Sequence, residues 1–270
     1  MKKLFALILA ALMVLSLTAC GGDSAATEAP TKAADEPSAA ADADVQAIID
    51  RGVLRVGVKN AVIGFGYQDP ISGEYSGMEI DIAKALAAQL GVDVEFTTVT
   101  AATRTELLDS GDIDCVLATF TITDERKQSW DFTTPYYTDH VTVLVEDSSG
   151  IKTLADLKDK LVGVSSGSTS ARALVSAMVD AGVLDGANFS KDTFDPATWK
   201  EGISFQQFDD YPGISTALAA GQVDAFCVDK SILAVYKTEG RSYIEDQFAP
   251  QEYGIATKKG SGWIAEYNLG

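Results

Sequence analysis

Two short stretches, one in each half of the chain, repeat the same pattern of residues. Gly111-Asp-Ile-Asp-Cys-Val and Gly221-Gln-Val-Asp-Ala-Phe each follow a segment of helical character and open a run of apolar residues. A glycine that ends a helix and is followed by a buried strand is a connection typical of α/β folds. The repetition therefore predicts two α/β lobes of one design, with a ligand site between the carboxyl ends of their strands.

Helices and short strands are expected to alternate in both halves of the chain. The clearest helix covers residues 77–91, which end on Gly91 and carry four apolar residues spaced four apart: Met78, Ile82, Leu86 and Leu90. In the first half we further expect strands at 50–58, 92–96 and 111–118 and a short helix at 104–109. In the second half we expect an extended segment at 140–145, a strand ending at Val164, helices at 165–181 and 211–221, a strand at 222–229, and no regular element at 182–204.

The first 44 residues have the features of an export signal and a tether. Lys2 and Lys3 precede an apolar run at 4–17 that is short for a membrane span, and Leu17-Thr-Ala-Cys20 resembles the cleavage site of lipoproteins. We expect residues 1–19 to be removed as a signal peptide and Cys20 to carry the lipid. Residues 20–44 contain almost no large apolar side chain and are predicted to form a disordered tether. An uncleaved N-terminal anchor is the alternative.

Composition argues against several classes of function. The formal net charge is −18, and no basic run suggests nucleic-acid binding. Cys115 and Cys227 stand in apolar, strand-like runs and are predicted to be buried free thiols. His140 is the only histidine and is expected to have a structural role. The chain lacks a P-loop, a nucleophilic-serine motif and a spacing of His and Cys typical of metal sites, so we expect neither an enzyme nor a cofactor.

A polar stretch follows the apolar run at 115–118. Thr119, Thr121 and Thr123 alternate at the end of the expected strand, and Thr123 is predicted to cap a helix that contains Arg126. A strand end that meets a helix start directs hydroxyls and free N–H groups to one point. A guanidinium beside them matches a carboxylate. The alternative is a surface turn with a solvated arginine.

The residue pattern of this stretch resembles that of a known protein family. T-x-T-x-x-x-x-R at 119–126, followed by Asp131-Phe-Thr-Thr-Pro-Tyr136, resembles the signature of the family 3 solute-binding proteins, the amino-acid-capturing components of ABC importers. The resemblance covers most of the chain after residue 43. It implies a two-lobe α/β fold of the type II periplasmic-binding-protein class, with the ligand cleft between lobes joined by two hinge strands. It also implies a monomer that delivers a free L-amino acid to a permease with an ATPase subunit.

The same resemblance implies the domain boundaries and part of the site. Residues 45–138 with 253–270 would form lobe 1 and residues 141–250 lobe 2, with hinges near 138–141 and 250–256. In the family, the position of Arg126 holds the ligand's α-carboxylate, that of Thr121 adds a donor, and that of Thr119 contacts the α-amine. From the second lobe the implied contacts are Ser168 and Thr169 to the carboxylate, Asp229 to the α-ammonium, and Tyr211. The alternatives are an ordinary helix cap at 168–169, a surface pair of Asp229 with Lys230, and a half-buried Tyr211.

Two further cations suggest which amino acid is bound. Lys59 follows the first strand and Arg104 opens the short helix after the second, so both are expected to reach the distal end of a ligand. A second carboxylate would neutralise them, whereas an uncharged side chain would leave buried charges unpaired. The sequence thus favours aspartate or glutamate. If Lys59 and Arg104 instead pair with protein acids such as Glu79 or Glu106, glutamine or another polar amino acid is the alternative. A dehydratase of a cyclic acid is the alternative from another functional class.

Overall fold

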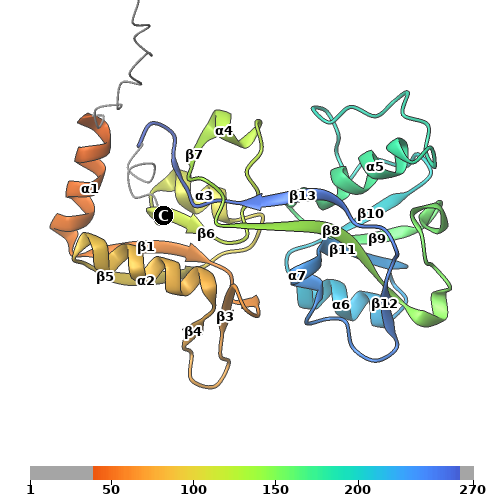
Figure 1. Cartoon of the computed structure of the whole chain (residues 1–270), viewed down its shortest axis with the longest axis horizontal. Coiled ribbons are helices and arrows are strands. Elements are labelled where there is room, and N and C mark those ends of the chain that lie inside the picture. Colours follow the sequence, from red (N-terminus) through yellow and green to blue (C-terminus); the bar gives the residue numbers. More distant parts are fainter. Residues whose placement is uncertain (1–38, 262–270) are drawn as a thin grey trace, which may run out of the picture. The chain divides into compact units, whose positions relative to one another are not determined.

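The computed structural model describes residues 39–261, all of which belong to one structural unit (Figure 1). The predicted signal peptide, lipid site at Cys20 and most of the predicted tether lie outside the described residues. Helix α1, Ala39–Arg51, begins inside the segment expected to be tether, where the sequence is rich in alanine, the strongest helix former. The first strand, expected at 50–58, consequently starts only at Val53, after Gly52 has ended the helix with a φ of 75°.

The first sheet has the strand order β5-β1-β6-β14-β7. Its strands are β1 (Val53–Val58), β5 (Asp93–Thr98), β6 (Cys115–Leu117), β7 (Trp130–Phe132) and β14 (Ala256–Lys258). β1 lies parallel to β5 and β6, whereas β14 runs antiparallel to β6 and β7. The helices of this lobe are α1, α2 (Met78–Leu90), α3 (Arg104–Ser110) and α4 (Arg126–Ser129), and a small sheet is formed by β2 (Ala61–Val62), β3 (Gly66–Gln68) and β4 (Tyr75–Ser76).

The second sheet repeats this order with different strands, β10-β9-β11-β8-β12. Its strands are β8 (Tyr137–Glu146), β9 (Leu161–Ser165), β10 (Ser204–Phe208), β11 (Ala225–Asp229) and β12 (Arg241–Tyr243), and β13 (Phe248–Tyr253) also pairs with β8. β9 lies parallel to β10 and β11, and β8 runs antiparallel to β11. The helical elements are η1 (Asp147–Ser149), η2 (Leu154–Leu157), α5 (Ser170–Asp180), α6 (Tyr211–Ala219) and α7 (Lys230–Leu233). The predicted two-lobe α/β architecture is thereby confirmed.

The repeated aspartate has the same function in both lobes. Asp114 accepts the backbone N–H of Arg55 at 2.8 Å and returns its own N–H to the carbonyl of the same residue. Asp224 makes the same two bonds with Leu161. In each lobe this pair of bonds joins one parallel strand, β1 or β9, to the residue just before the next strand, β6 or β11. The repeated sequence pattern therefore helps to fix the register of these two strand pairs.

β8 and β13 connect the two lobes. The start of β8, from Tyr137 to Val141, pairs antiparallel with β13, while its later residues pair with β11 inside the second sheet. Thr121 of the first lobe forms a bridge with Tyr253 of β13. The register of β13 shifts between Phe248 and Pro250, where Ala249 adopts a φ of 48°. An irregularity of this kind lets a strand change direction between two sheets.

The helix α2 matches its prediction, with one difference in the buried face. Gly91 adopts the left-handed conformation and its N–H bonds the last turn, as expected. The fully buried residues, however, follow a spacing of three and four: Ile80, Ala83, Leu86, Ala87 and Leu90. Met78 and Ile82, which the four-residue spacing placed on that face, are only half-buried. An α-helix has 3.6 residues per turn, so a strict spacing of four rotates away from the core.

Residues 182–203 contain turns but neither helix nor strand, as predicted. An aromatic cluster holds this segment against the second lobe. The rings of Phe194 and Trp199 lie 5.5 Å apart, and Phe194 is 6.1 Å from Phe205 of β10. Phe189 completes the cluster with edge-to-face contacts to both Phe194 and Trp199. Aromatic packing thus replaces backbone regularity here.

Cys115 and Cys227 are buried free thiols, as expected. Within residues 39–261 no helix is both long and apolar enough to cross a membrane. His140 is exposed on β8. The described part of the chain contains no cluster of three His, Cys, Asp or Glu side chains suited to a metal ion.

Gly77 is the glycine on which the start of α2 depends. Its φ is 121°, and a Cβ there would lie 2.2 Å from the carbonyl oxygen of Phe65, which accepts the N–H of Glu79. We expect Gly77→Ala to lower the free energy of unfolding by about 2 to 4 kcal/mol, from backbone strain and the clash together. Urea denaturation measures it. Gly73→Ala is the control, because Gly73 has a positive φ but open space around it, and about 1 kcal/mol is expected. Equal losses in the two variants would contradict the role of the clash.

Candidate functional site

Two arginines of the first lobe share one aromatic ring. The guanidinium of Arg104, at the start of α3, lies 3.9 Å from the centre of the Phe120 ring, and that of Arg126, at the start of α4, lies 4.6 Å from it. Burial lowers the pKa of both groups, and the charge of Arg104 further lowers that of Arg126. Among residues 43–261 no carboxylate lies within 4 Å of either guanidinium. Two desolvated cations held this close form a site for an anion.

Lys59 adds a third cation, which is buried as Arg104 is, whereas Arg126 is half-buried. Lys59 directly follows β1, is 5% exposed, and its ammonium lies 5.3 Å from the ring centre of Tyr211 in the second lobe. Burial and the charge of Arg104 hold its pKa well below the usual range. Among the described residues neither Glu79 nor Glu106 forms an ion pair within 4 Å of Lys59 or Arg104. The charge of Glu79 nevertheless acts to raise the pKa of both cations.

Glu79 is nevertheless close to these cations and is fully buried. One of its oxygens, Oε1, accepts the N–H of Thr119 and the hydroxyl of Tyr136, both at 2.6 Å. Its Oε2 has no hydrogen-bond partner among the described residues. Burial raises the pKa of Glu79, while its hydrogen bonds and the charges of Lys59 and Arg104 act in the opposite direction. Glu79 therefore orients the backbone at Thr119 and tempers the positive charge of the site.

Asp229 stands at the end of β11 and faces the site from the second lobe. Its Oδ2 accepts the hydroxyl of Tyr253 at 2.5 Å, and its Oδ1 has no partner among residues 43–261. Asp229 is 6% exposed and forms no ion pair with Lys230 in this part of the chain, so it is not the surface pair given as the alternative. Burial raises its pKa from 3.8 to about 7, although Tyr253, Arg104 and Arg126 act to lower it. The unpartnered oxygen of this carboxylate is available to accept a hydrogen bond from a ligand.

Thr119 and Tyr211 complete the buried part of the site. Thr119 adopts a φ of 45°, its carbonyl accepts from Arg104 at 3.3 Å, and its hydroxyl has no partner among the described residues. Tyr211 is 6% exposed rather than half-buried, and burial next to Asp229 raises its pKa.

Unsatisfied polar atoms concentrate at this one place. Six buried side-chain nitrogen or oxygen atoms lack a hydrogen-bond partner within the described chain, and four of them surround the site: Glu79 Oε2, Arg104 Nε, Thr119 Oγ1 and Asp229 Oδ1. Such atoms are rare in folded proteins, and each carries an energetic cost. Donors and acceptors that converge from both lobes suit a small ligand that carries both kinds of charge.

The remaining predicted residues bond to other parts of the protein. The hydroxyls of Thr121 and Thr169 both donate to the side chain of Gln251, and Ser168 Oγ accepts the N–H of Ser170. Arg126 donates to the carbonyl of Thr121 at 2.8 Å and to that of Gly167 at 3.1 Å. Thr123 accepts the N–H of Arg126, as a capping residue does, although the helix itself starts at Arg126.

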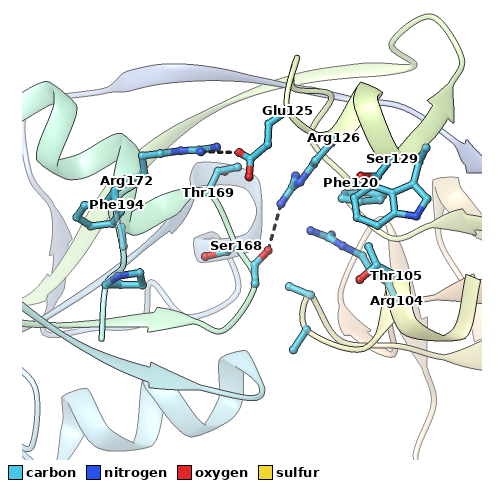
Figure 2. Close-up of a pocket in the computed structure, with 16 residues that line it drawn as sticks. Arg104, Thr105, Phe120, Glu125, Arg126, Ser129, Ser168, Thr169, Arg172 and Phe194 are labelled. Atoms are coloured by element: carbon cyan, nitrogen blue, oxygen red, sulfur yellow. Dashed lines mark hydrogen bonds and ion pairs between the residues drawn. The ribbon is translucent and has the colours of Figure 1, made fainter. Parts of the chain in front are cut away.

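The lobes meet around this site. Figure 2 shows Arg172 of α5 directed at Glu125 of the first lobe, with which it forms an ion pair at 2.7 Å. Arg172 also donates to the carbonyl of Lys191 in the 182–204 segment. A Cβ on Gly167 would lie 2.7 Å from the carbonyl oxygen of Ala101, so the two main chains are in direct contact there.

A cavity of about 340 Å³ opens between the lobes (Figure 2). Four of the nine predicted site residues line it: Arg104, Arg126, Ser168 and Thr169. Phe194 and Pro196 of the 182–204 segment line it from the second lobe. The other five predicted residues, Lys59, Thr119, Thr121, Tyr211 and Asp229, do not line it and are at most 6% exposed.

Sequence reasoning missed Phe120, Gln251 and Arg172. Phe120 lies between two threonines that were predicted to contact the ligand, and its position in the alternation could have indicated a side chain that faces the opposite way. Gln251 and Arg172 make contacts across more than 40 residues of sequence, for which the sequence gives no local signal.

Comparisons with known proteins agree with this architecture. Residues 54–234 match the bacterial extracellular solute-binding proteins, family 3. The chain is 34% identical to the ABC transporter glutamine-binding protein GlnH of Bacillus subtilis, with 98% of this chain and 89% of that protein covered. It is 30% identical to the glutamate-binding protein GluB of Corynebacterium efficiens, with 79% and 70% covered. Among solved structures, an ancestral arginine-binding protein bound to arginine matches with a TM-score of 0.66 at 34% identity, over 80% of this chain and 88% of that one.

The family match covers most of the described residues and includes both lobes. Its boundaries enclose each predicted site residue from Lys59 to Asp229. On these grounds the chain belongs to family 3 of the bacterial extracellular solute-binding proteins.

Proposed function

We propose that this protein captures an acidic L-amino acid, aspartate or glutamate, between its two lobes and delivers it to the permease of an ABC importer. The observation that carries the proposal is a set of three cations, the buried Lys59 and Arg104 and the half-buried Arg126, that form no ion pair among the described residues. Each buried charge that is left unpaired costs about 3 to 5 kcal/mol. A ligand with two carboxylates would remove that cost.

The proposed contacts follow from where each group lies. Arg126 holds the α-carboxylate, with the hydroxyl of Ser168 nearby. The hydroxyls of Thr121 and Thr169, expected at this carboxylate, donate their hydrogens to Gln251 and are not assigned to the ligand. Asp229 receives the α-ammonium, assisted by Thr119. Lys59 and Arg104 bind the distal carboxylate, and Tyr211 lies beside it. Because these residues come from both lobes, only the closed arrangement provides all the contacts, and ligand binding would favour closure.

The charge balance supports an acidic ligand. With all five side chains ionised, Lys59, Arg104 and Arg126 carry three positive charges against two negative charges on Glu79 and Asp229. The site then has one net positive charge, which an amino acid of net charge −1 neutralises. A zwitterionic ligand of zero net charge would leave that charge buried.

Glutamine is the second candidate ligand. The similarity to GlnH, a glutamine-binding protein by name, favours it, and so does the presence of Glu79. The Oε2 of Glu79 could accept hydrogen bonds from a ligand amide, while Arg104 donates to the amide oxygen. In that case the charge of Lys59 would be reduced through its lowered pKa.

The proposal includes the rest of the chain as the sequence suggested it. Cleavage before Cys20 and its lipidation would anchor the protein to the outer face of the cell membrane through residues 20–44. Residues 45–138 with 253–270 would form lobe 1 and residues 141–250 lobe 2, with hinges at 138–141 and 250–256. The protein would act as a monomer, with permease and ATPase subunits as partners and without catalytic activity. Conversion of prephenate or arogenate by the purified protein would instead indicate the dehydratase alternative.

Titration calorimetry with glutamate, aspartate and glutamine tests the ligand class. We expect either acid to bind at least about 100-fold more tightly than glutamine, because glutamine leaves a buried cation unpaired. Lys59→Met should reduce acid binding by a similar factor and change glutamine binding little. Lys152→Met, in the exposed start of the second lobe, is the matched control. Tighter binding of glutamine than of both acids would refute the acidic ligand while leaving amino-acid binding intact.

The contacts proposed for the ligand's α-carboxylate and α-ammonium are tested by Arg126→Ala and Asp229→Ala. Each variant leaves one charge of a desolvated pair without its partner, so affinity for the preferred amino acid should fall about 100-fold to several-thousand-fold. Thermal unfolding without ligand checks that each variant is folded. Wild-type affinity in a folded variant would remove that residue from the site.

Affinity should depend on pH through Asp229. Its pKa of about 7 without ligand means that the carboxyl must release a proton before it can pair with an ammonium. Affinity should therefore rise about tenfold from pH 5 to pH 6 and level off above pH 7, with proton release on binding. The folding stability of the ligand-free protein depends on pH in the opposite sense. The raised pKa of Asp229 favours folding at low pH, and this contribution is lost as the pH rises from about 4 through about 7. Calorimetry in buffers of different ionisation enthalpy measures the proton, and a flat profile in the wild type would contradict the assignment.

A further inference from the structure

Gln251 of β13 holds hydroxyls from both lobes on a single oxygen atom. Its Oε1 accepts from Thr121 at 2.8 Å and from Thr169 at 2.7 Å. Thr121 follows β6 in the first lobe, and Thr169 stands before α5 in the second. Gln251 itself is 4% exposed, although it lies in the strand that joins the lobes.

Hinge backbone fixes the orientation of this amide. The Nε2 of Gln251 donates to the carbonyls of Ala249 and Pro250, at 3.1 and 3.3 Å. Carbonyls accept but never donate, so the NH2 group must face them and the oxygen must face the two threonines. The amide is thus held in place by the hinge, with its acceptor directed into the junction of the lobes.

The two hydrogen bonds differ in what opening the lobes would do to them. Thr121 forms a backbone bridge with Tyr253, so the end of β13 that carries Gln251 is tied to the first lobe. The irregularity at Ala249 lies between Gln251 and Phe248, which pairs with Val141, the residue of β8 at which pairing with β11 begins. If the chain bends there, the bond from Thr121 is kept and the bond from Thr169 breaks.

We propose that Gln251 is a positioning residue that latches the closed conformation through Thr169 and thereby slows release of the ligand. The effect on ligand release rests on the proposed function, whereas the hydrogen bond between the lobes does not depend on it. A single neutral hydrogen bond contributes about 0.5 to 1.5 kcal/mol, so its loss should speed ligand release about 2- to 13-fold. Association should change little, because the bond forms only on closure.

The test uses the full chain with two substitutions at the donor, Thr169, and one at the acceptor, Gln251. Thr169→Val replaces the hydroxyl with a methyl group, and Thr169→Ser keeps it. Gln251→Met removes the acceptor at similar volume. Thr216→Val is the control, because Thr216 is an exposed threonine whose hydroxyl bonds within its own helix to Pro212. Stopped-flow measurement gives the release rate of the bound amino acid, and small-angle scattering without amino acid gives the radius of gyration.

The latch predicts faster release in Thr169→Val and Gln251→Met, near-wild-type release in Thr169→Ser and Thr216→Val, and no additional effect when the valine and methionine changes are combined. Multiplied effects in the double variant would mean that Thr169 acts on the ligand directly, and would overturn the latch. Wild-type values of both release and radius of gyration in Gln251→Met would also overturn it. If the wild type binds no amino acid, the proposed function fails, and scattering alone decides the latch: a larger radius of gyration in Gln251→Met than in the wild type supports it, and an equal one overturns it.

Discussion

The rest of the site depends on the desolvation of two guanidiniums against one phenylalanine ring. Arg104 and Arg126 both contact Phe120, whose side chain is buried in the first lobe, and neither has a carboxylate within reach among the described residues. Coulombic repulsion in a medium of low polarity would separate them if their backbones were free to move. The carbonyls of Ala118 and Thr121, at the end of one strand, fix them in place. The sheet thus supports an arrangement of charges that is unfavourable until an anion arrives.

The fold could be inferred from the sequence largely because the two lobes repeat one local rule. The aspartates of the repeated phrase, Asp114 and Asp224, bond to the neighbouring strand in the same manner, and short-range patterns of this kind are visible in a sequence. The exact face of α2 was misjudged because four-residue spacing was followed where the helix turns every 3.6 residues. Helix α1 extended into the expected tether because alanine favours a helix even where few apolar side chains are available.

The site was predictable where strand ends determine it and obscure where the lobes meet. Lys59 directly follows β1 and Asp229 is the last residue of β11, so their convergence follows from the topology of the two sheets. The hydroxyls of Thr121 and Thr169 were expected at the ligand but are bonded to Gln251, a residue far away in sequence. Such contacts arise from the angle at which two lobes close, which no local pattern encodes.

The close approach of Gly167 to Ala101 gives this closure a fixed end point. A side chain that contacts another can change its rotamer, but two backbones in contact have no such freedom. The second lobe therefore cannot advance further however strongly a ligand attracts it, and the depth of the site is a property of the main chain. Ligands of different length would have to be accommodated by side chains alone, with the travel of the lobes held constant.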